Sequence, residues 1–142
     1  MGKATAIRLS QYQVHLILSD RDEEGLKETA HLVEQKGSTA RIETLDMSDN
    51  KAIIQLAKKV IADGEIISGL YQFAGVSQRS LVTETPLEND RKIMEVNFFG
   101  LITLAKAILP HMIENGGGQM AAASSLVGKF GFPYRSAYAA SK

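Results

Sequence analysis

Apolar and polar segments alternate along this chain with a regular period. Four short runs are apolar enough to form buried strands, and they lie at residues 14–19, 39–45, 67–75 and 119–125. The last run is rich in alanine, which has little preference for strands. The segments around these runs repeat apolar residues at helical spacing, and we expect helices at residues 3–12, 22–36, 48–64 and about 87–114. Helices that alternate with strands predict an α/β fold with a parallel sheet.

Residues with special backbone preferences mark the ends of the predicted helices. Ser48 is placed to cap the start of one helix. Gly37 and Gly64 each follow a helix, and the "NGGG" segment at residues 115–118 ends the longest one. Because no repeat, low-complexity tract or linker interrupts the series, residues 1–142 are predicted to form part of one domain.

Charge and composition exclude several classes of partner. The chain holds 16 basic and 16 acidic side chains without a basic run, so neither nucleic acid nor an anionic membrane surface is an expected partner. The chain has no cysteine, which excludes disulfide bonds and thiolate chemistry. No segment is expected to approach membrane-spanning length, and no metal site is predicted. We therefore expect a soluble cytoplasmic protein.

The residues that follow each predicted strand are candidates for ligand binding, because ligands of parallel sheets collect at the carboxyl ends of the strands. Asp20 could accept hydrogen bonds from both hydroxyls of an adenine ribose, or it could cap the helix that begins near Asp22. Asp46 could reach an adenine edge or only shape a turn. At Ala74 and Gly75, small or missing side chains would let a flat ligand approach the backbone.

Tyr138 and Lys142 form a candidate catalytic pair near the end of the chain. They are four positions apart, so on a helix they project from one face, one turn from each other. An ammonium beside a phenol favours the phenolate, as a proton donor or acceptor for a carbonyl/alcohol couple requires. Alternatively, Tyr138 is a packing aromatic near a helix start. Ser125, thirteen residues before Tyr138, and its neighbour Ser124 follow the last strand.

Together these segments resemble the short-chain dehydrogenase/reductase family. The resemblance rests on "LSDRDEEGL", "LDMSD", "FAGVSQRSL", "MEVNFFG", "LPHMIENGGG" and "SSLVGKFGFPYRSAYAASK", which cover almost the whole chain. Members of this family pass hydride between NAD(H) or NADP(H) and an alcohol/carbonyl pair. The resemblance implies a Rossmann-like parallel sheet with flanking helices, and a small-molecule alcohol or carbonyl substrate.

The resemblance also implies a role for each catalytic candidate. Tyr138 would give a proton to the substrate carbonyl oxygen or take one from the alcohol. Lys142 would favour the phenolate and hold the nicotinamide ribose, and Ser125 would hydrogen-bond the substrate oxygen. The side chain of Asn97 would bind a water that links Lys142 to solvent; otherwise Asn97 is an exposed helix residue.

The implied cofactor is NAD or NADP. Asp20 favours NAD because its carboxylate would repel a 2′-phosphate, whereas the adjacent Arg21 could bind that phosphate. The expected cofactor-binding residues are Gly2, Asp20, Arg21, Asp46, Ala74, Gly75, Tyr138 and Lys142.

The chain also departs from the family pattern. The family opens with a strand and a glycine-rich turn, roughly T-G-x-x-x-G-I-G, of which only Gly2 stands in the place of the last glycine. Gln72 and Phe73 replace the two asparagines of the family's N-N-A-G. The fold is therefore predicted to be incomplete, without the first strand and the C-terminal elements, and the isolated chain to be poorly soluble or self-associating and inactive.

Two hypotheses of different class follow. The first is an NAD(P)-dependent oxidoreductase, expected to form a homo-oligomer when complete, because helices like those that carry Asn97 and Tyr138 commonly form the family's dimer interface. The alternative is an inactive fragment or pseudoenzyme that acts only through protein–protein association.

Overall fold

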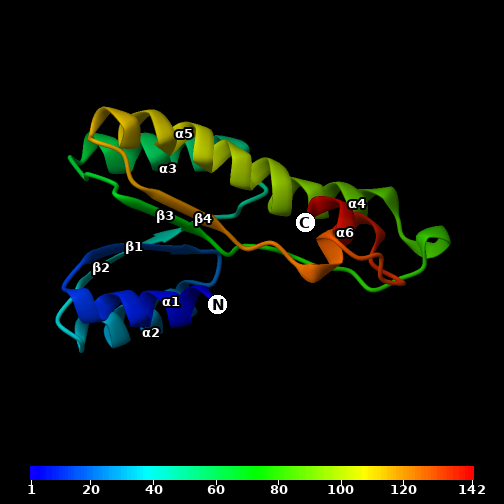
Figure 1. Cartoon of the computed structure of the whole chain (residues 1–142), viewed down its shortest axis with the longest axis horizontal. Helices are drawn as coiled ribbons and strands as arrows, with labels where there is room; N and C mark the ends of the chain where they lie inside the picture. Colours follow the sequence, from blue (N-terminus) through cyan, green and yellow to red (C-terminus); the bar gives the residue numbers. More distant parts are fainter. The chain divides into compact units, whose positions relative to one another are not determined.

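The computed structural model describes all 142 residues, which divide into two compact units, Met1–Asp46 and Met47–Lys142. Each unit contains one pair of parallel strands with helices packed on it (Figure 1). The predicted α/β class, with parallel strands and flanking helices, is confirmed.

The first unit is a two-stranded parallel sheet covered by helices. Its elements are α1 (Gly2–Leu9), a 3-10 turn (Ser10–Tyr12), β1 (His15–Asp20), α2 (Glu23–Glu34) and β2 (Thr39–Thr44). β1 pairs with β2 from His15 opposite Thr39 onward. Leu26 and Val33, on one face of α2, are buried. The chain turns out of α2 at Gly37, whose φ of +86° is favourable for glycine, as its predicted place at a helix end requires.

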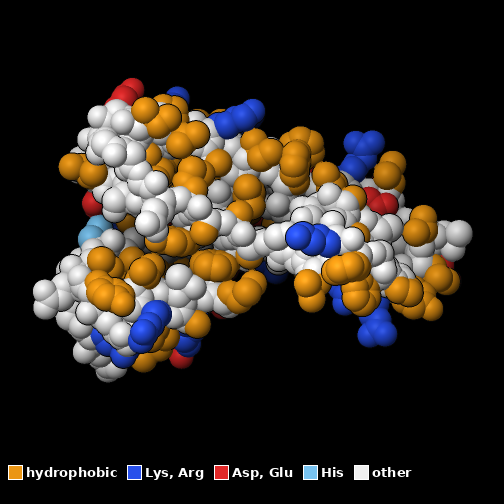
Figure 2. Space-filling view, in the orientation of Figure 1, with side chains coloured by type: hydrophobic (Ala, Val, Ile, Leu, Met, Phe, Trp, Pro, Cys, Tyr) orange, Lys and Arg blue, Asp and Glu red, His pale blue; other side chains and the backbone are white.

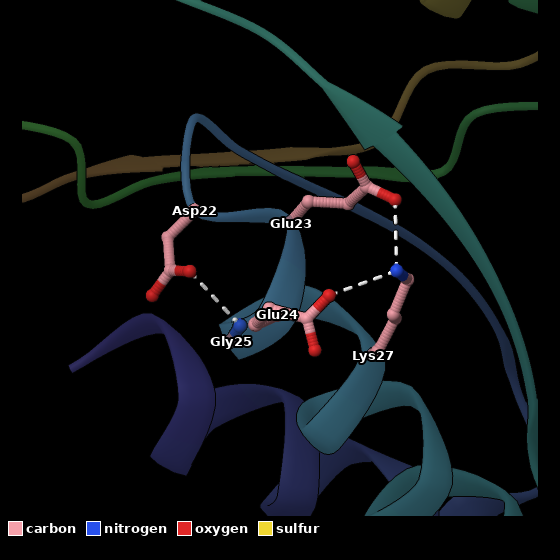
Figure 3. A network of polar contacts seen from close by, with 5 residues as sticks. All are labelled: Asp22, Glu23, Glu24, Gly25 and Lys27. Atoms are coloured by element: carbon pink, nitrogen blue, oxygen red, sulfur yellow. Dashed lines mark hydrogen bonds and ion pairs between the residues drawn. The ribbon is translucent and has the colours of Figure 1, made fainter.

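The start of α2 is fixed by polar contacts at its first turn (Figure 3). The Asp22 carboxylate caps the helix by accepting a hydrogen bond of 3.1 Å from the Gly25 backbone N–H. Lys27 donates to the carboxylates of Glu24 and Glu23, each at 2.9 Å. The hydrogen bonds to Glu24 and Glu23 raise the pKa of Lys27 to about 12. The helix therefore begins directly after the carboxyl end of β1.

The second unit holds the remaining strands and the longest helical stretch. Its elements are α3 (Asn50–Ala62), β3 (Gly69–Gln72), a 3-10 turn (Val82–Glu84), α4 (Leu87–Met94), a π-helical turn (Glu95–Phe99), α5 (Gly100–Glu114), β4 (Gln119–Ala122), a 3-10 turn (Leu126–Gly128) and α6 (Ser136–Ser141). β3 and β4 are parallel neighbours, with Gly69 opposite Gln119. α3 and α5 lie side by side (Figure 1), and their core consists of Ala57, Ile108 and Met112.

The predicted cap of α3 is wrong by one residue. Ser48 is not the N-cap; Asp49 is, and its carboxylate accepts hydrogen bonds of 3.0 Å from the backbone N–H groups of residues 51 and 52. Because the helix begins at Asn50, the Asp49 side chain is the one within reach of the first free amides.

The helix predicted at residues 87–114 is continuous but contains a π-helical turn at Glu95–Phe99. By length and composition alone, Leu87–Glu114 could cross a membrane, with a mean hydropathy of 1.5 in its most apolar window. The expectation that no segment approaches that length is therefore wrong. The apolar residues Ile108 and Met112 are core residues, so part of this hydropathy belongs to the packing of α5 on α3.

Gly100, directly after the π-helical turn, lies where the backbone of another segment passes very closely. A Cβ atom there would be 2.0 Å from the Met47 carbonyl oxygen and 3.1 Å from that of Glu95. Both neighbours are backbone atoms, which cannot rotate away as a flexible side chain can. A glycine is therefore required at the junction of the π-helical turn and α5.

We predict that Gly100→Ala destabilises the protein by about 3 kcal/mol or more, because the added methyl group forces backbone segments apart. Gly131→Ala is the matched control, since a Cβ atom at Gly131 would meet nothing within 4 Å. Denaturant unfolding followed by circular dichroism measures both. Equal stability of the two variants would contradict the close approach.

Candidate functional site

The carboxyl ends of β3 and β4 lie at one edge of their sheet. Gln72 is opposite Ala122, and the Ala123 N–H donates to the Gln72 carbonyl at 2.8 Å, one residue beyond the strands. Both strands are shorter than the predicted 67–75 and 119–125, because their ladder pairing lasts four residues. The segments that carry the predicted site residues therefore leave the sheet together at this edge.

Asn97, in the π-helical turn, holds the segment that follows β3. The Val76 N–H donates to Asn97 Oδ1 at 2.8 Å, and Asn97 Nδ2 donates to the Val76 carbonyl at 2.9 Å. The second N–H of Nδ2 is taken by Ser141 Oγ, also at 2.9 Å. With an exposed fraction of 3%, Asn97 is buried, so the alternative of an exposed helix residue is wrong. Oδ1 keeps one lone pair that could accept from a water.

Ser141 extends this connection to the helix that carries the predicted pair. Its hydroxyl accepts from Asn97 and donates to the Tyr138 carbonyl at 2.8 Å. The buried amide of Asn97 therefore joins the segment after β3 to α6. Neither Ser141 nor Val76 was predicted as a site residue from the sequence. The only sequence signal for Ser141 is that it is a small polar residue at a position expected on the buried face of a short helix. Val76 acts through its backbone N–H and carbonyl, which every residue carries, so the sequence gives no signal for it.

Lys142, the C-cap of α6, directs its ammonium toward the ends of the two strands. Nζ donates to the Ala123 carbonyl at 2.9 Å. A Cβ atom at Gly75 would lie 3.3 Å from both Lys142 Nζ and Asn97 Oδ1. The missing side chain at Gly75 thus leaves room for these two groups. The predicted approach of a cofactor at Ala74 and Gly75 stays a prediction.

The segment after β4 holds the backbone of Lys142. Ser124 Oγ donates to the Lys142 carbonyl at 3.0 Å, and a Cβ atom at Gly128 would lie 2.5 Å from the same carbonyl group. Ser125 Oγ accepts a hydrogen bond of 3.4 Å from the Val127 N–H. Because Ser125 accepts there, its own O–H remains able to donate to another oxygen.

Tyr138 lies half-buried on α6, and its hydroxyl makes no hydrogen bond. The guanidinium carbon of Arg135 is 5.7 Å from the centre of its ring. The Lys142 ammonium is bound to the Ala123 carbonyl and not to the phenol. Tyr138 on α6 and Lys142 at its C-cap therefore offer a phenol without a hydrogen bond and an ammonium with two uncommitted N–H groups.

The other cofactor-binding candidates lie in the first unit. Asp20, Arg21 and Asp46 are exposed, and Gly2 is the first residue of α1. Asp20 Oδ1 accepts from the Asp22 N–H at 3.1 Å, so it supports the turn into α2, but the N-cap is Asp22 itself. Asp20 Oδ2 stays available as an acceptor.

Comparison with known proteins decides the family. The sequence profile of the family described as short chain dehydrogenase matches residues 1–142. The chain belongs to the short-chain dehydrogenase family. Among curated relatives of this dehydrogenase chain, dehydrogenase/reductase SDR family member 7B of Rattus norvegicus is 39% identical over 148 residues, covering all of this chain and 46% of the rat protein. The chain spans about half the length of the curated relatives it matches.

Solved structures show the same Rossmann-like fold. NAD+-bound xylitol dehydrogenase is 29% identical, with a TM-score of 0.92 over 99% of this chain and 55% of the other. An alcohol dehydrogenase of the archaeon Thermococcus sibiricus, complexed with 5-hydroxy-NADP, is 25% identical, with a TM-score of 0.88 over 99% of this chain and 60% of the other. The short-chain dehydrogenase chain therefore resembles structures solved with either kind of nicotinamide cofactor.

We predict that Ser141→Ala destabilises the protein by about 1–3 kcal/mol, because it leaves one N–H of the buried Asn97 amide without an acceptor. Hydrogen exchange of the Val76 amide should become faster, because its hydrogen bond to the Asn97 side chain would open more often. Ser68→Ala is the matched control, since Ser68 is exposed and its hydroxyl makes no hydrogen bond. Equal stability of the two variants would show that the hydrogen bond between Ser141 and Asn97 does not contribute to the free energy of unfolding.

Proposed function

We propose that this chain carries the proton-transfer residues of an NAD(P)-dependent oxidoreductase that interconverts an alcohol and a carbonyl compound. Membership of the short-chain dehydrogenase family supports dehydrogenase or reductase activity with a nicotinamide cofactor. The observation that carries the finer proposal is the buried Asn97 amide, which fixes α6, with Tyr138 and Lys142, beside the carboxyl ends of β3 and β4. Ligands of Rossmann-like sheets bind at this edge.

In the proposed reaction, Tyr138 gives its proton to the carbonyl oxygen of the substrate, or takes one from the alcohol. The Tyr138 hydroxyl suits this role because it makes no hydrogen bond within the protein and can therefore bind the substrate oxygen. Ser125 donates its O–H to the same oxygen while it accepts from the Val127 N–H. Lys142 keeps two N–H groups beyond the one on Ala123, and these would bind ribose hydroxyls of the cofactor.

The cofactor would supply or accept the hydride, and its proposed contacts are the residues that the family resemblance implies. Asp20 fits a ribose hydroxyl, because only one of its carboxylate oxygens is engaged within the protein. The proposed preference is NAD, since the Asp20 carboxylate would repel the 2′-phosphate that NADP carries on this ribose. Arg21 is the residue that would favour NADP instead. Gly2, Asp46 and the Ala74–Gly75 segment complete the proposed contacts.

Apolar side chains on the long helical stretch of the second unit support self-association. Phe98, Phe99, Leu109 and Ile113 are 41%, 46%, 41% and 65% exposed. Figure 2 shows hydrophobic side chains along α5 on the face in view. We propose that this surface contacts a second copy of the chain. The same surface favours the alternative function, association without catalysis, and binding of NADH together with turnover would decide between the two.

The decisive test of the proposed function is Tyr138→Phe in the protein that the gene encodes. We expect kcat to fall by about a hundredfold or more, because the proton donor is removed. The Kd for NADH measured by calorimetry should change little, because the substitution removes little volume. Tyr134→Phe is the control, since it removes a hydroxyl that also makes no hydrogen bond. Turnover of a panel of alcohols and carbonyl compounds is measured. Full activity of Tyr138→Phe, or no activity in the unmodified protein, would contradict the proposal.

The cofactor preference is tested by Asp20→Ala and Arg21→Ala. Loss of a charge-assisted hydrogen bond to the ribose should weaken NAD+ binding by about tenfold or more in Asp20→Ala and narrow the preference over NADP+. Arg21→Ala should leave NAD+ binding unchanged. Calorimetric titration of each variant with both cofactors gives the result. A protein that prefers NADP+ and loses this preference in Arg21→Ala would show that Arg21, and not Asp20, selects the cofactor.

A further inference from the structure

The loop that follows β3 is attached to the segment that precedes α6 by a set of hydrogen bonds. They are Arg135 Nη1 to Ser77 Oγ, Arg135 Nη1 to the Gln78 carbonyl (2.9 Å), Gln78 Nε2 to Ser136 Oγ (3.3 Å) and the Ser80 N–H to the Tyr134 carbonyl (3.3 Å). At its start, the loop is also held by the two hydrogen bonds between Val76 and Asn97. Residues 76–80 are therefore fixed at both ends to parts of the candidate site.

Arg135 contributes more of these contacts than any other side chain of the segment. Its Nη1 serves two acceptors, Ser77 and the Gln78 carbonyl, while the guanidinium carbon lies 5.7 Å from the centre of the Tyr138 ring. This distance is within the range of a cation–π contact. Arg135 makes no salt bridge, so no carboxylate draws the guanidinium away from the ring or the loop.

The backbone just before Arg135 also serves this attachment. Tyr134 has a φ of +65°, which is uncommon for a bulky residue and persists where the surrounding contacts hold it. In this conformation, the Tyr134 carbonyl accepts from the Ser80 N–H. The segment is thus held in a conformation that presents both its carbonyl and the Arg135 side chain to the loop.

We propose that Arg135 is a positioning residue that fixes loop 76–80 against the helix of Tyr138 and so forms one wall of the substrate site before substrate binds. The inference rests on the proposed function, because it takes Tyr138 as the proton donor. A preformed wall keeps the substrate carbonyl within reach of the phenol, and hydride transfer requires near-contact geometry. A lysine cannot reproduce this arrangement, because the planar guanidinium offers several fixed donors together with a face for the ring.

The first test measures the attachment in the chain itself. Arg135→Gln should speed hydrogen exchange of the Ser80 amide by about tenfold, because hydrogen bonds from a charged donor are lost. It should also shift the ring signals of Tyr138 in NMR spectra, since the cation leaves the ring face. Arg135→Lys should be intermediate. Arg79→Gln is the matched control, because Arg79 lies in the same loop, is exposed and makes no hydrogen bond or ion pair. Equal exchange in Arg135→Gln and Arg79→Gln would overturn the proposal.

The second test separates positioning from mere structural support. In the protein that the gene encodes, Arg135→Gln should lower kcat by about tenfold to a hundredfold while the Kd for NADH stays unchanged. The control for activity is Arg91→Gln, which should change neither, because Arg91 lies on α4 outside the proposed site, is exposed and makes no side-chain hydrogen bond or ion pair. A loosened loop with normal kcat would overturn the positioning role and leave the proposed function standing. Absence of turnover in the unmodified protein would overturn the proposed function and with it the catalytic part of this inference, while the exchange comparison would still decide whether Arg135 holds the loop.

Discussion

The buried side-chain amide of Asn97 is the contact on which the candidate site depends. Its three hydrogen bonds reach the backbone of Val76 on one side and the hydroxyl of Ser141 on the other. A primary amide offers two donors and an acceptor in one plane, so a single side chain can satisfy both backbone groups of one residue and still bind a second segment. Removing any of these partners would leave a polar group buried without a hydrogen bond, which is why the arrangement is expected to be rigid.

Glycines at three positions make room for groups that pass close to the backbone around the site. Gly75 makes room for the Lys142 ammonium and the Asn97 amide, Gly128 for the Lys142 carbonyl, and Gly100 for the Met47 carbonyl. At none of these positions is φ positive, so the reason for glycine is space and not backbone conformation. The position of the ammonium thus depends on residues far from it in sequence, and a methyl group at one of them would displace it without changing its chemistry.

Features that depend on local spacing could be predicted from the order of residues alone. Strands and helices alternate as the apolar periodicity predicted, and Gly37 and Gly64 lie in positive-φ conformations where helices were expected to end. Tyr138 and Lys142 belong to one short helical segment because four residues make about one turn. The motifs around them were specific enough to indicate the family, which the match over the whole chain confirms. Each of these conclusions needs only neighbours within a few residues.

The groups that meet in the candidate site, in contrast, follow from long-range packing. Asn97 lies 21 residues from Val76 and 44 from Ser141, and no periodicity connects positions so far apart. Arg135 likewise contacts a loop 57 residues earlier in the chain. The sequence also gave no signal for the π-helical turn that contains Asn97. Nor did it indicate that the Lys142 ammonium binds a backbone carbonyl. Hydrogen bonds of this kind depend on the packing of whole elements, which fixes distances that the order of residues alone does not contain.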